Sequence, residues 1–318
     1  MDFRKDLKNN LLSLQRELIN HTYEPQPMKT FVIRDPKTRV ISASAFRDRI
    51  VHHALCNVIE PIFDKTFIYD SYANRKGKGT HAALRRFDYF KQKVSGNGKL
   101  LPNAKDNNQV YGYVLKADIK HYFYSVDHEI MMQVIGRKIK DKKILRLIKK
   151  ILDNHTSQIG MPIGNLTSQF FANVYLNELD YFVKHRLKAK YYIRYVDDFV
   201  ILDASRERLE FYKSEINEFL KTIKLELHPE KSRVYPLHRG VNLLGFRIFY
   251  YYKLPYKRNK RRFLSRLETL LEAYKNNEIE AGRVKEKIQG WFAYAEWSNT
   301  HKLRNEITKK VNKTLTLE

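Results

Sequence analysis

Hydrophobic residues spaced for helices recur along most of the chain. Near the N-terminus, within residues 3–20, leucines occupy one helical face at Leu7, Leu11, Leu14 and Leu18. Similar spacing predicts helices over residues 47–60, 81–93, 129–153, 165–185 and 206–224. We expect the 47–60 helix to end ahead of Pro61, because proline lacks the backbone N–H that continues a helix. Beyond residue 254 the pattern changes to basic helices, which predicts a domain boundary there.

Short β-rich runs lie between these helices. Residues 30–33 and 39–42 flank a turn at 35–38 and predict a hairpin. An apolar strand over residues 110–116 follows a polar surface insertion at 94–109, and residues 241–252 predict a hairpin or a pair of strands.

Three carboxylates follow strands in this pattern. Asp118 comes directly after the 110–116 run, and Asp197 and Asp198 lie between β-rich runs at 191–196 and 199–202, at the tip of a predicted hairpin. An Asp-Asp pair is also an ordinary turn sequence. The aromatic and β-branched surroundings favour a metal site instead, because an unpaired charge is costly to bury there. Oxygen ligands suit Mg²⁺, and two such ions about 3.5–4 Å apart support nucleotidyl transfer.

The amino-acid composition indicates what kind of molecule the protein binds. The 318 residues include 60 Lys and Arg against 35 Asp and Glu, a net charge of +25, with 13% aromatic residues. Such a field favours a polyanion, most often nucleic acid, over the alternative of a merely solvated basic surface. The single cysteine, Cys56, excludes an intrachain disulfide and is expected to be buried. With no secretory signal and no apolar run of membrane-spanning length, we expect a soluble cytoplasmic protein without a membrane partner.

Two basic segments are candidate phosphate-binding sites. The predicted hairpin carries Arg34, Lys37 and Arg39, which suit a triphosphate or equally the protection of an edge strand. Residues 71–80 combine glycines and cations, among them Arg75, ahead of a helix N-terminus, an arrangement that can cradle phosphate.

An aromatic residue and a glycine loop are the remaining candidates. Phe123, five residues after Asp118, either closes a sugar pocket or is a core aromatic. The loop at 160–164 contains Gly160, Pro162 and Gly164, and it either tests the shape of a base pair or simply begins the next helix.

Seven short motifs, in this order, resemble those of reverse transcriptases, and the match covers nearly the whole chain. They lie at residues 47–55 (RDRIVHHAL), 75–80 (RKGKGT), 117–120 (ADIK), 160–164 (GMPIG), 195–198 (YVDD), 228–231 (HPEK) and 242–246 (NLLGF). The resemblance implies an α+β fold, that of a right-hand polymerase. Its parts would be an N-terminal helix and fingers at 1–110, a ferredoxin-like palm at 111–254 that includes a fingers/palm helix at 165–185, and a helical thumb at 255–318.

The resemblance also implies roles for the acidic residues. Asp118 and Asp197 would hold two Mg²⁺ ions, or Mn²⁺ in their place, with the main-chain carbonyl of Ile119 assisting and Asp198 beside them. Lys231 occupies the position of a proton donor to pyrophosphate. The implied partners are template RNA, the cDNA or primer, and dNTPs. The predicted substrate-binding residues are Arg34, Lys37, Arg39, Arg75, Phe123 as a steric gate against ribonucleotides, Ile163 and Gln169.

One departure narrows the resemblance. Most relatives have Pro-Gln-Gly where this chain has Pro162, Ile163 and Gly164, and Ser-Pro where it has Ser168 and Gln169. This combination is similar to the reverse transcriptases of diversity-generating retroelements, which misincorporate mainly at template adenines and work with a small basic, ring-forming accessory protein. Loss of the glutamine amide removes about 0.5–1.5 kcal/mol, or roughly threefold to tenfold in selection, too little alone for heavy mutagenesis.

Three alternatives remain open. An intron-encoded enzyme usually carries a longer maturase region, which we do not find before Glu318. A defence-associated enzyme extends DNA without a template in some cases. A non-catalytic RNA-binding scaffold is disfavoured, because a scaffold has no need for clustered acids on a surface that must attract phosphate.

Overall fold

The structure, a computed structural model, describes residues 3–34, 37–154 and 158–315. The chain divides into two compact units, the first comprising residues 1–79, 115–201 and 207–233, and the second residues 80–114, 202–206 and 234–318. Within the described ranges, no helix combines the length and apolar character needed to cross a membrane.

A four-stranded sheet carries the acidic residues. Its strands in chain order are β3 (Tyr113–Asp118), β4 (Tyr191–Tyr195), β5 (Asp198–Asp203) and β6 (Arg233–Pro236), and their spatial order is β4-β5-β3-β6. Helices separate β3 from β4 and β5 from β6, whereas β4 and β5 are joined directly. This is the βαββαβ arrangement of a ferredoxin-like sheet, and it confirms the predicted palm architecture. Compared with the expected strand at 110–116, β3 is shifted so that Asp118 is its last residue.

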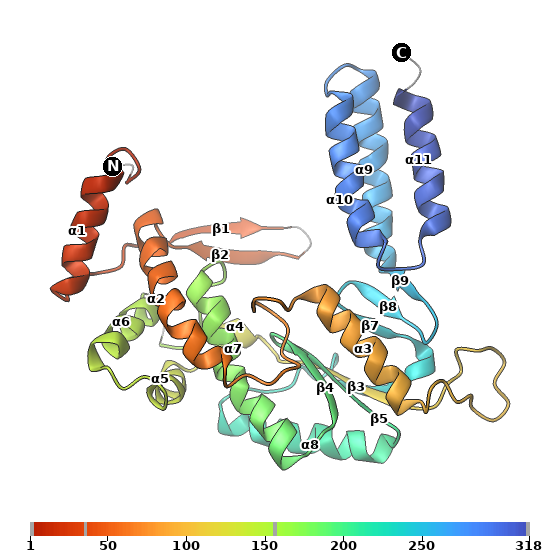
Figure 1. Cartoon of the computed structure of the whole chain (residues 1–318), viewed down its shortest axis with the longest axis horizontal. Coiled ribbons are helices and arrows are strands. Elements are labelled where there is room, and N and C mark those ends of the chain that lie inside the picture. The colour runs from red at the N-terminus through yellow and green to blue at the C-terminus, as the bar shows by residue number, and fades with distance from the viewer. Residues whose placement is uncertain (1–2, 35–36, 155–157, 316–318) are drawn as a thin grey trace. The chain divides into compact units, whose positions relative to one another are not determined.

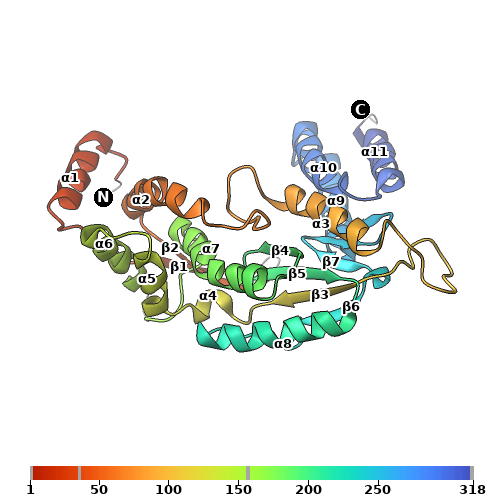
Figure 2. The same ribbon diagram turned by 60° about the horizontal axis from the view of Figure 1, so that its bottom comes forward.

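The helices of the first unit match the predicted pattern with one error. They are α1 (Leu7–Ile19), α2 (Phe46–Asp64), α4 (Tyr122–Ser125), α5 (His128–Gly136), α6 (Lys142–Asp153), α7 (Leu166–Tyr181), which continues as the π-helical turn Phe182–Arg186, and α8 (Arg206–Thr222), which runs alongside the sheet in Figure 2. The predicted end of α2 ahead of Pro61 is wrong, because Ile59 and Phe63, four positions apart on one face, are both buried and carry the helix past the proline. Cys56 is buried in α2, as predicted.

A two-stranded hairpin precedes α2. Strands β1 (Lys29–Ile33) and β2 (Arg39–Ala43) pair antiparallel, with Lys29 opposite Ala43 and Ile33 opposite Arg39 (Figure 1). Asp35 and Pro36 of the predicted turn lie outside the described residues.

The second unit is built on helices and a smaller sheet. It contains α3 (Thr80–Val94), the antiparallel strands β7 (Val241–Leu243), β8 (Phe246–Ile248) and β9 (Lys253–Pro255), and the helices α9 (Lys257–Lys275), α10 (Ala281–Ala295) and α11 (His301–Leu315). The last three helices lie side by side in Figure 1 and enclose a core of Leu267, Leu271, Tyr274, Val284, Ile288, Ile307 and Val311. The turn between β7 and β8 needs Gly245, since both Leu244 and Gly245 have positive φ.

The two units interleave along the chain. Helix α3, which the sequence places with the fingers at 1–110, belongs by its contacts to the second unit, where Lys253 pairs with Asp88 and Lys91 donates to the carbonyl of Phe249. The division into fingers, palm and thumb at residues 110 and 254 stays a prediction.

Candidate active site

Adjacent strands bring the three predicted carboxylates to one end of the sheet. Asp118 ends β3, Asp197 lies in the turn after β4, and Asp198 begins β5, which is the neighbour of β3. The backbone N–H of Ile119 donates to the carbonyl of Asp197 at 3.1 Å, which ties the end of β3 to this turn. All three carboxylates are half-buried.

The turn that presents Asp197 is strained. Val196 has a φ of 54°, in the left-handed region, which is unfavourable for a β-branched side chain. Residues in such conformations persist only where their surroundings hold them, and they are concentrated at functional sites. The conformation of Val196 therefore favours a functional role for this turn over an ordinary Asp-Asp turn.

Two lysines neutralise two of the three acids. The Lys231 Nζ lies 2.9 Å from the Asp118 Oδ1, and the Lys116 Nζ lies 2.8 and 2.9 Å from the two oxygens of Asp198. Lys231 is placed by its neighbours, since the N–H of His228 donates to the carbonyl of Asp118 at 2.8 Å. Lys116 was not among the residues predicted for this site. Its signal was the period of two along a strand, which puts residues 116 and 118 on one face.

The surroundings of Asp197 disfavour the ionised form of its carboxyl group. Burial, and to a smaller extent the charges of Asp118 and Asp198, raises its pKa from the ordinary 3.8 to about 6, while a main-chain hydrogen bond and, more weakly, Lys231 oppose the shift. Burial also raises the pKa of Asp198, with Lys116 opposing. A carboxylate held ionised against such a penalty gains from a nearby cation.

The donor chemistry fits a divalent cation that the substrate helps to hold. In the described part of the chain no three His, Cys, Asp or Glu side chains form a ready-made metal cluster. Mg²⁺ usually binds through one or two carboxylates and completes its octahedron with water and substrate phosphates. Asp118 and Asp197, whose charges affect each other, are oxygen donors that could form such a smaller set.

The predicted sugar pocket and the glycine loop lie against each other. The N–H of Met161 donates to the carbonyl of Phe123 at 2.6 Å, and the N–H of Gly160 donates to the carbonyl of Val126 at 2.7 Å. Gly160 has a φ of 95°, and a Cβ there would lie 3.2 Å from the carbonyl oxygens of Phe123 and Tyr124. The ring of Phe123 is half-buried and meets Tyr122 edge-on at 5.4 Å. Glycine at 160 therefore allows the loop to approach this backbone.

The same loop anchors the hairpin. The N–H of Ser42 donates to the carbonyl of Ile163 at 3.0 Å, and a Cβ on Gly164 would lie 2.8 Å from a methyl group of Ile41. The Oδ1 of Asn165 accepts from both the N–H and the hydroxyl of Ser44, at 3.1 and 3.0 Å. This Asn165–Ser44 contact joins residues far apart in the chain and was not predicted. Ile163 is half-buried.

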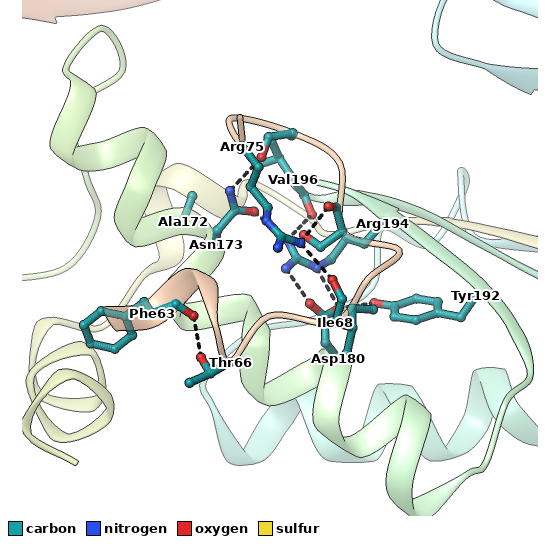
Figure 3. A network of polar contacts seen from close by, with 12 residues as sticks. Phe63, Thr66, Ile68, Arg75, Ala172, Asn173, Asp180, Tyr192, Arg194 and Val196 are labelled. Carbon is teal, nitrogen blue, oxygen red and sulfur yellow. Dashed lines mark hydrogen bonds and ion pairs between the residues drawn. The ribbon is translucent and has the colours of Figure 1, made fainter. Parts of the chain in front are cut away.

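The remaining predicted substrate residues differ in their surroundings. Arg34, Lys37 and Arg39 are exposed on the hairpin, and Gln169 is exposed on α7. Arg75 is directed inward: its guanidinium pairs with Asp64 at 2.6 Å and donates to the carbonyls of Ile68 and Ser71 (Figure 3). Arg75 thus holds its own loop in shape, and its predicted contact with the substrate stays a prediction.

A ferredoxin-like sheet with acids on adjacent strand ends defines the palm of a right-hand polymerase. Solved structures support this class of fold. The chain aligns over 96% of its length with telomerase from Candida albicans in complex with the TWJ fragment of telomeric RNA, at a TM-score of 0.58 and 13% identity, covering 56% of that chain. Apo telomerase from Candida tropicalis aligns over 96% of this chain and 66% of its own, with a TM-score of 0.56 and 13% identity.

Sequence comparison gives the family. The family described as reverse transcriptase (RNA-dependent DNA polymerase) matches residues 27–248, so the chain belongs to it. Protein YkfC of Escherichia coli is 26% identical over 278 residues, covering 74% of this chain and 70% of YkfC. The group II intron-encoded protein LtrA of Lactococcus lactis is 25% identical over 307 residues, covering 73% of this chain and 48% of LtrA. The chain thus spans about half the length of LtrA. The predicted enzyme class, RNA-directed DNA polymerase, is confirmed.

Proposed function

We propose that this protein copies an RNA template into cDNA by nucleotidyl transfer at the end of β3 and the β4–β5 turn. The observation that carries the proposal is the convergence of Asp118, Asp197 and Asp198 at the ends of the adjacent strands β3 and β5. Burial, with a smaller contribution from the two neighbouring acids, raises the pKa of Asp197 to about 6, so a bound cation would relieve the cost of its charge. Template RNA, a primer and dNTPs are the substrates that this family membership favours.

The residues would divide the work as follows. Asp118, Asp197 and the Ile119 carbonyl would hold Mg²⁺ or Mn²⁺, with Asp198 beside them. Two bound ions supply activation of the primer 3′-hydroxyl and stabilisation of the leaving pyrophosphate. Lys231, whose ammonium lies 2.9 Å from the Asp118 Oδ1, would give a proton or a positive charge to the leaving group. Arg34, Lys37 and Arg39 would contact the triphosphate.

Substitution of Phe123 tests whether this residue closes a pocket around the sugar of the incoming nucleotide. We expect Phe123→Val to raise incorporation of ribonucleotides relative to deoxynucleotides by roughly tenfold or more, the scale on which missing methylenes in a pocket alter selection. The measurement is the ratio of kcat/KM for rNTP and dNTP. Tyr124→Val, at the adjacent residue, which is 52% exposed, is the matched control. A ratio that changes equally in both variants would make Phe123 an ordinary packing residue.

We further propose that synthesis is error-prone at template adenines, as in mutagenic retrohoming. Ile163 and Gln169 support this finer function, because they stand where most relatives have glutamine and proline. A small basic, ring-forming accessory protein is the proposed partner. Since this chain itself carries a charge of +25, bound RNA is needed to offset the repulsion between the two.

A second candidate is an intron-type reverse transcriptase, favoured by the similarity to LtrA. Primer extension on a defined RNA with Mg²⁺ and dNTPs, followed by sequencing, separates the two. Errors concentrated at adenines support mutagenic copying, and faithful cDNA supports the intron type. Product without template points to a defence-type enzyme, and no product in any condition favours the RNA-binding scaffold.

Ile163 offers a direct test of the fidelity argument. We expect Ile163→Gln to lower the error rate at template adenines by roughly threefold to tenfold, since it restores one hydrogen bond near the new base pair. The main-chain contact from Ser42 to the carbonyl of Ile163 does not involve the side chain, so the loop keeps its place. Ile159→Gln, at a residue 52% exposed, serves as the control. Unchanged errors in sequenced cDNA would count against a role for Ile163.

A further inference from the structure

Arg194 is a fully buried cation directly behind the acidic turn. It lies in β4 with its side chain 0% exposed, and it pairs with Asp180 of α7, also 0% exposed, through Nε at 2.7 Å and Nη2 at 2.6 Å. Tyr192 donates its hydroxyl to the same carboxylate at 2.8 Å. Burial of this ion pair is costly unless every donor is satisfied, so the remaining contacts of the guanidinium matter.

The third nitrogen of Arg194 reaches the strained residue. Nη1 donates to the main-chain carbonyl of Val196 at 3.3 Å and to the Oδ1 of Asn173 at 3.0 Å. Figure 3 shows the guanidinium between α7 and the turn, with dashed lines to both. Val196 is the residue with a φ of 54°, immediately before Asp197. A charged donor therefore holds the peptide that sets the direction of the catalytic turn.

Arg194 also fixes residues 70–73, at the start of the basic 71–80 segment. Its N–H donates to the carbonyl of Asp70 at 3.0 Å, and its carbonyl accepts from the N–H of Tyr72 at 3.0 Å. Asn173, which accepts from Arg194, also donates to the carbonyl of Ala73 at 2.8 Å and so connects α7 to the same segment. One buried residue thus joins β4, α7, residues 70–73 and the turn.

We propose that Arg194 is a positioning residue for the metal-binding carboxylates, which holds Val196 in its left-handed conformation so that Asp197 and Asp198 present their oxygens to a divalent cation. The inference rests on the proposed function of this site. Asp180 pairs with Nε and Nη2 of Arg194 and leaves Nη1 to donate to the Val196 carbonyl. One guanidinium therefore forms the ion pair and holds the turn at the same time. Lysine has one nitrogen in place of the fork and is not equivalent here.

The test compares Arg194→Lys with the double variant Arg194→Lys/Val196→Gly. Glycine adopts positive φ without strain, so it should remove the need for the Nη1 contact. We measure Mn²⁺ affinity by electron paramagnetic resonance, with Asp197→Asn as the baseline and Val196→Gly alone as the control. Arg194→Lys should weaken Mn²⁺ binding by about tenfold, the scale of losing a residue that orients a ligand, and the added glycine should restore most of it.

A purely structural role gives a different result. Both lysine variants would then melt at a lower temperature, while Mn²⁺ affinity below the melting range would equal that of the wild type, or the glycine would restore nothing. Either outcome overturns the proposal. If Arg194→Lys does not fold, Arg194→Gln/Asp180→Asn removes both buried charges together, and the same comparison with and without Val196→Gly applies. Absence of cDNA synthesis by the wild type would refute the proposed function, whereas Mn²⁺ binding still decides the role of Arg194.

Discussion

Asp197→Asn is expected to lower dNTP incorporation by roughly three orders of magnitude or more, the scale of losing a group that acts in the chemical step. The amide keeps the shape of the side chain and removes the charge that would hold the cations. RNA binding should be largely unchanged, because Asp197 would serve metal ions and repels backbone phosphates. Primer extension measures the first effect, and a filter-binding or anisotropy titration with the RNA measures the second.

The same substitution should stabilise the metal-free protein. The pKa of Asp197 is about 6 in the fold, above its ordinary 3.8, so ionisation opposes folding. The wild type therefore loses stability relative to Asp197→Asn as pH rises from about 4 to about 6, and the difference, roughly 1–3 kcal/mol, is constant above that window and vanishes below it. Thermal melting at several pH values without divalent ions measures this.

Asp203→Asn is the matched control for both measurements. Asp203 ends the same strand that Asp198 begins, and its Oδ1 accepts from the N–H of Ser205 at 2.9 Å, a contact that asparagine can keep. Its activity and its pH-dependent melting should follow the wild type. Appreciable synthesis by Asp197→Asn would remove Asp197 from the metal site.

Asp180→Ala should have the largest effect on stability. Removing this carboxylate leaves the guanidinium of Arg194 buried without its partner and deprives the hydroxyl of Tyr192 of its acceptor. Breaking a buried pair from one side costs about 3–5 kcal/mol. Urea denaturation followed by circular dichroism measures the loss.

Glu178→Ala provides the comparison on the same helix. Glu178 pairs with Arg137 at 2.8 Å, but the side chains are 26% and 60% exposed, so we expect a cost below about 1 kcal/mol. Similar losses in the two variants would mean that the Asp180–Arg194 pair contributes no more than a surface ion pair. The contrast between the two variants isolates the effect of burial.

The sequence located the acidic residues well because strands and their ends leave a local signal. The alternation that predicts a strand before Asp118 and a hairpin around Asp197 and Asp198 is a property of neighbouring residues. The same period of two could have identified Lys116. The boundary error at Pro61 has the opposite origin, since burial of Phe63 by the rest of the fold outweighed a local rule.

Contacts between distant residues could not be predicted in this way. Arg194 is conspicuous as one cation in an aromatic, β-branched strand, which indicates a partner, but nothing local identifies Asp180 on α7 as that partner. The docking of the 160–164 loop on the hairpin through Ser42 depends equally on the assembled fold. The ordered motifs of the family supplied the fold that local patterns alone do not specify.

The most direct test of the proposed function is incorporation of labelled dNTP on a primed RNA template, with Mg²⁺, by the wild type and Asp197→Asn side by side. We predict template-directed cDNA from the wild type, none when EDTA removes the metal, and none from Asp197→Asn. Synthesis that persists in Asp197→Asn would contradict the proposed metal site. A wild type that binds the RNA but extends no primer, with Mg²⁺ or Mn²⁺, would contradict the proposed polymerase activity itself.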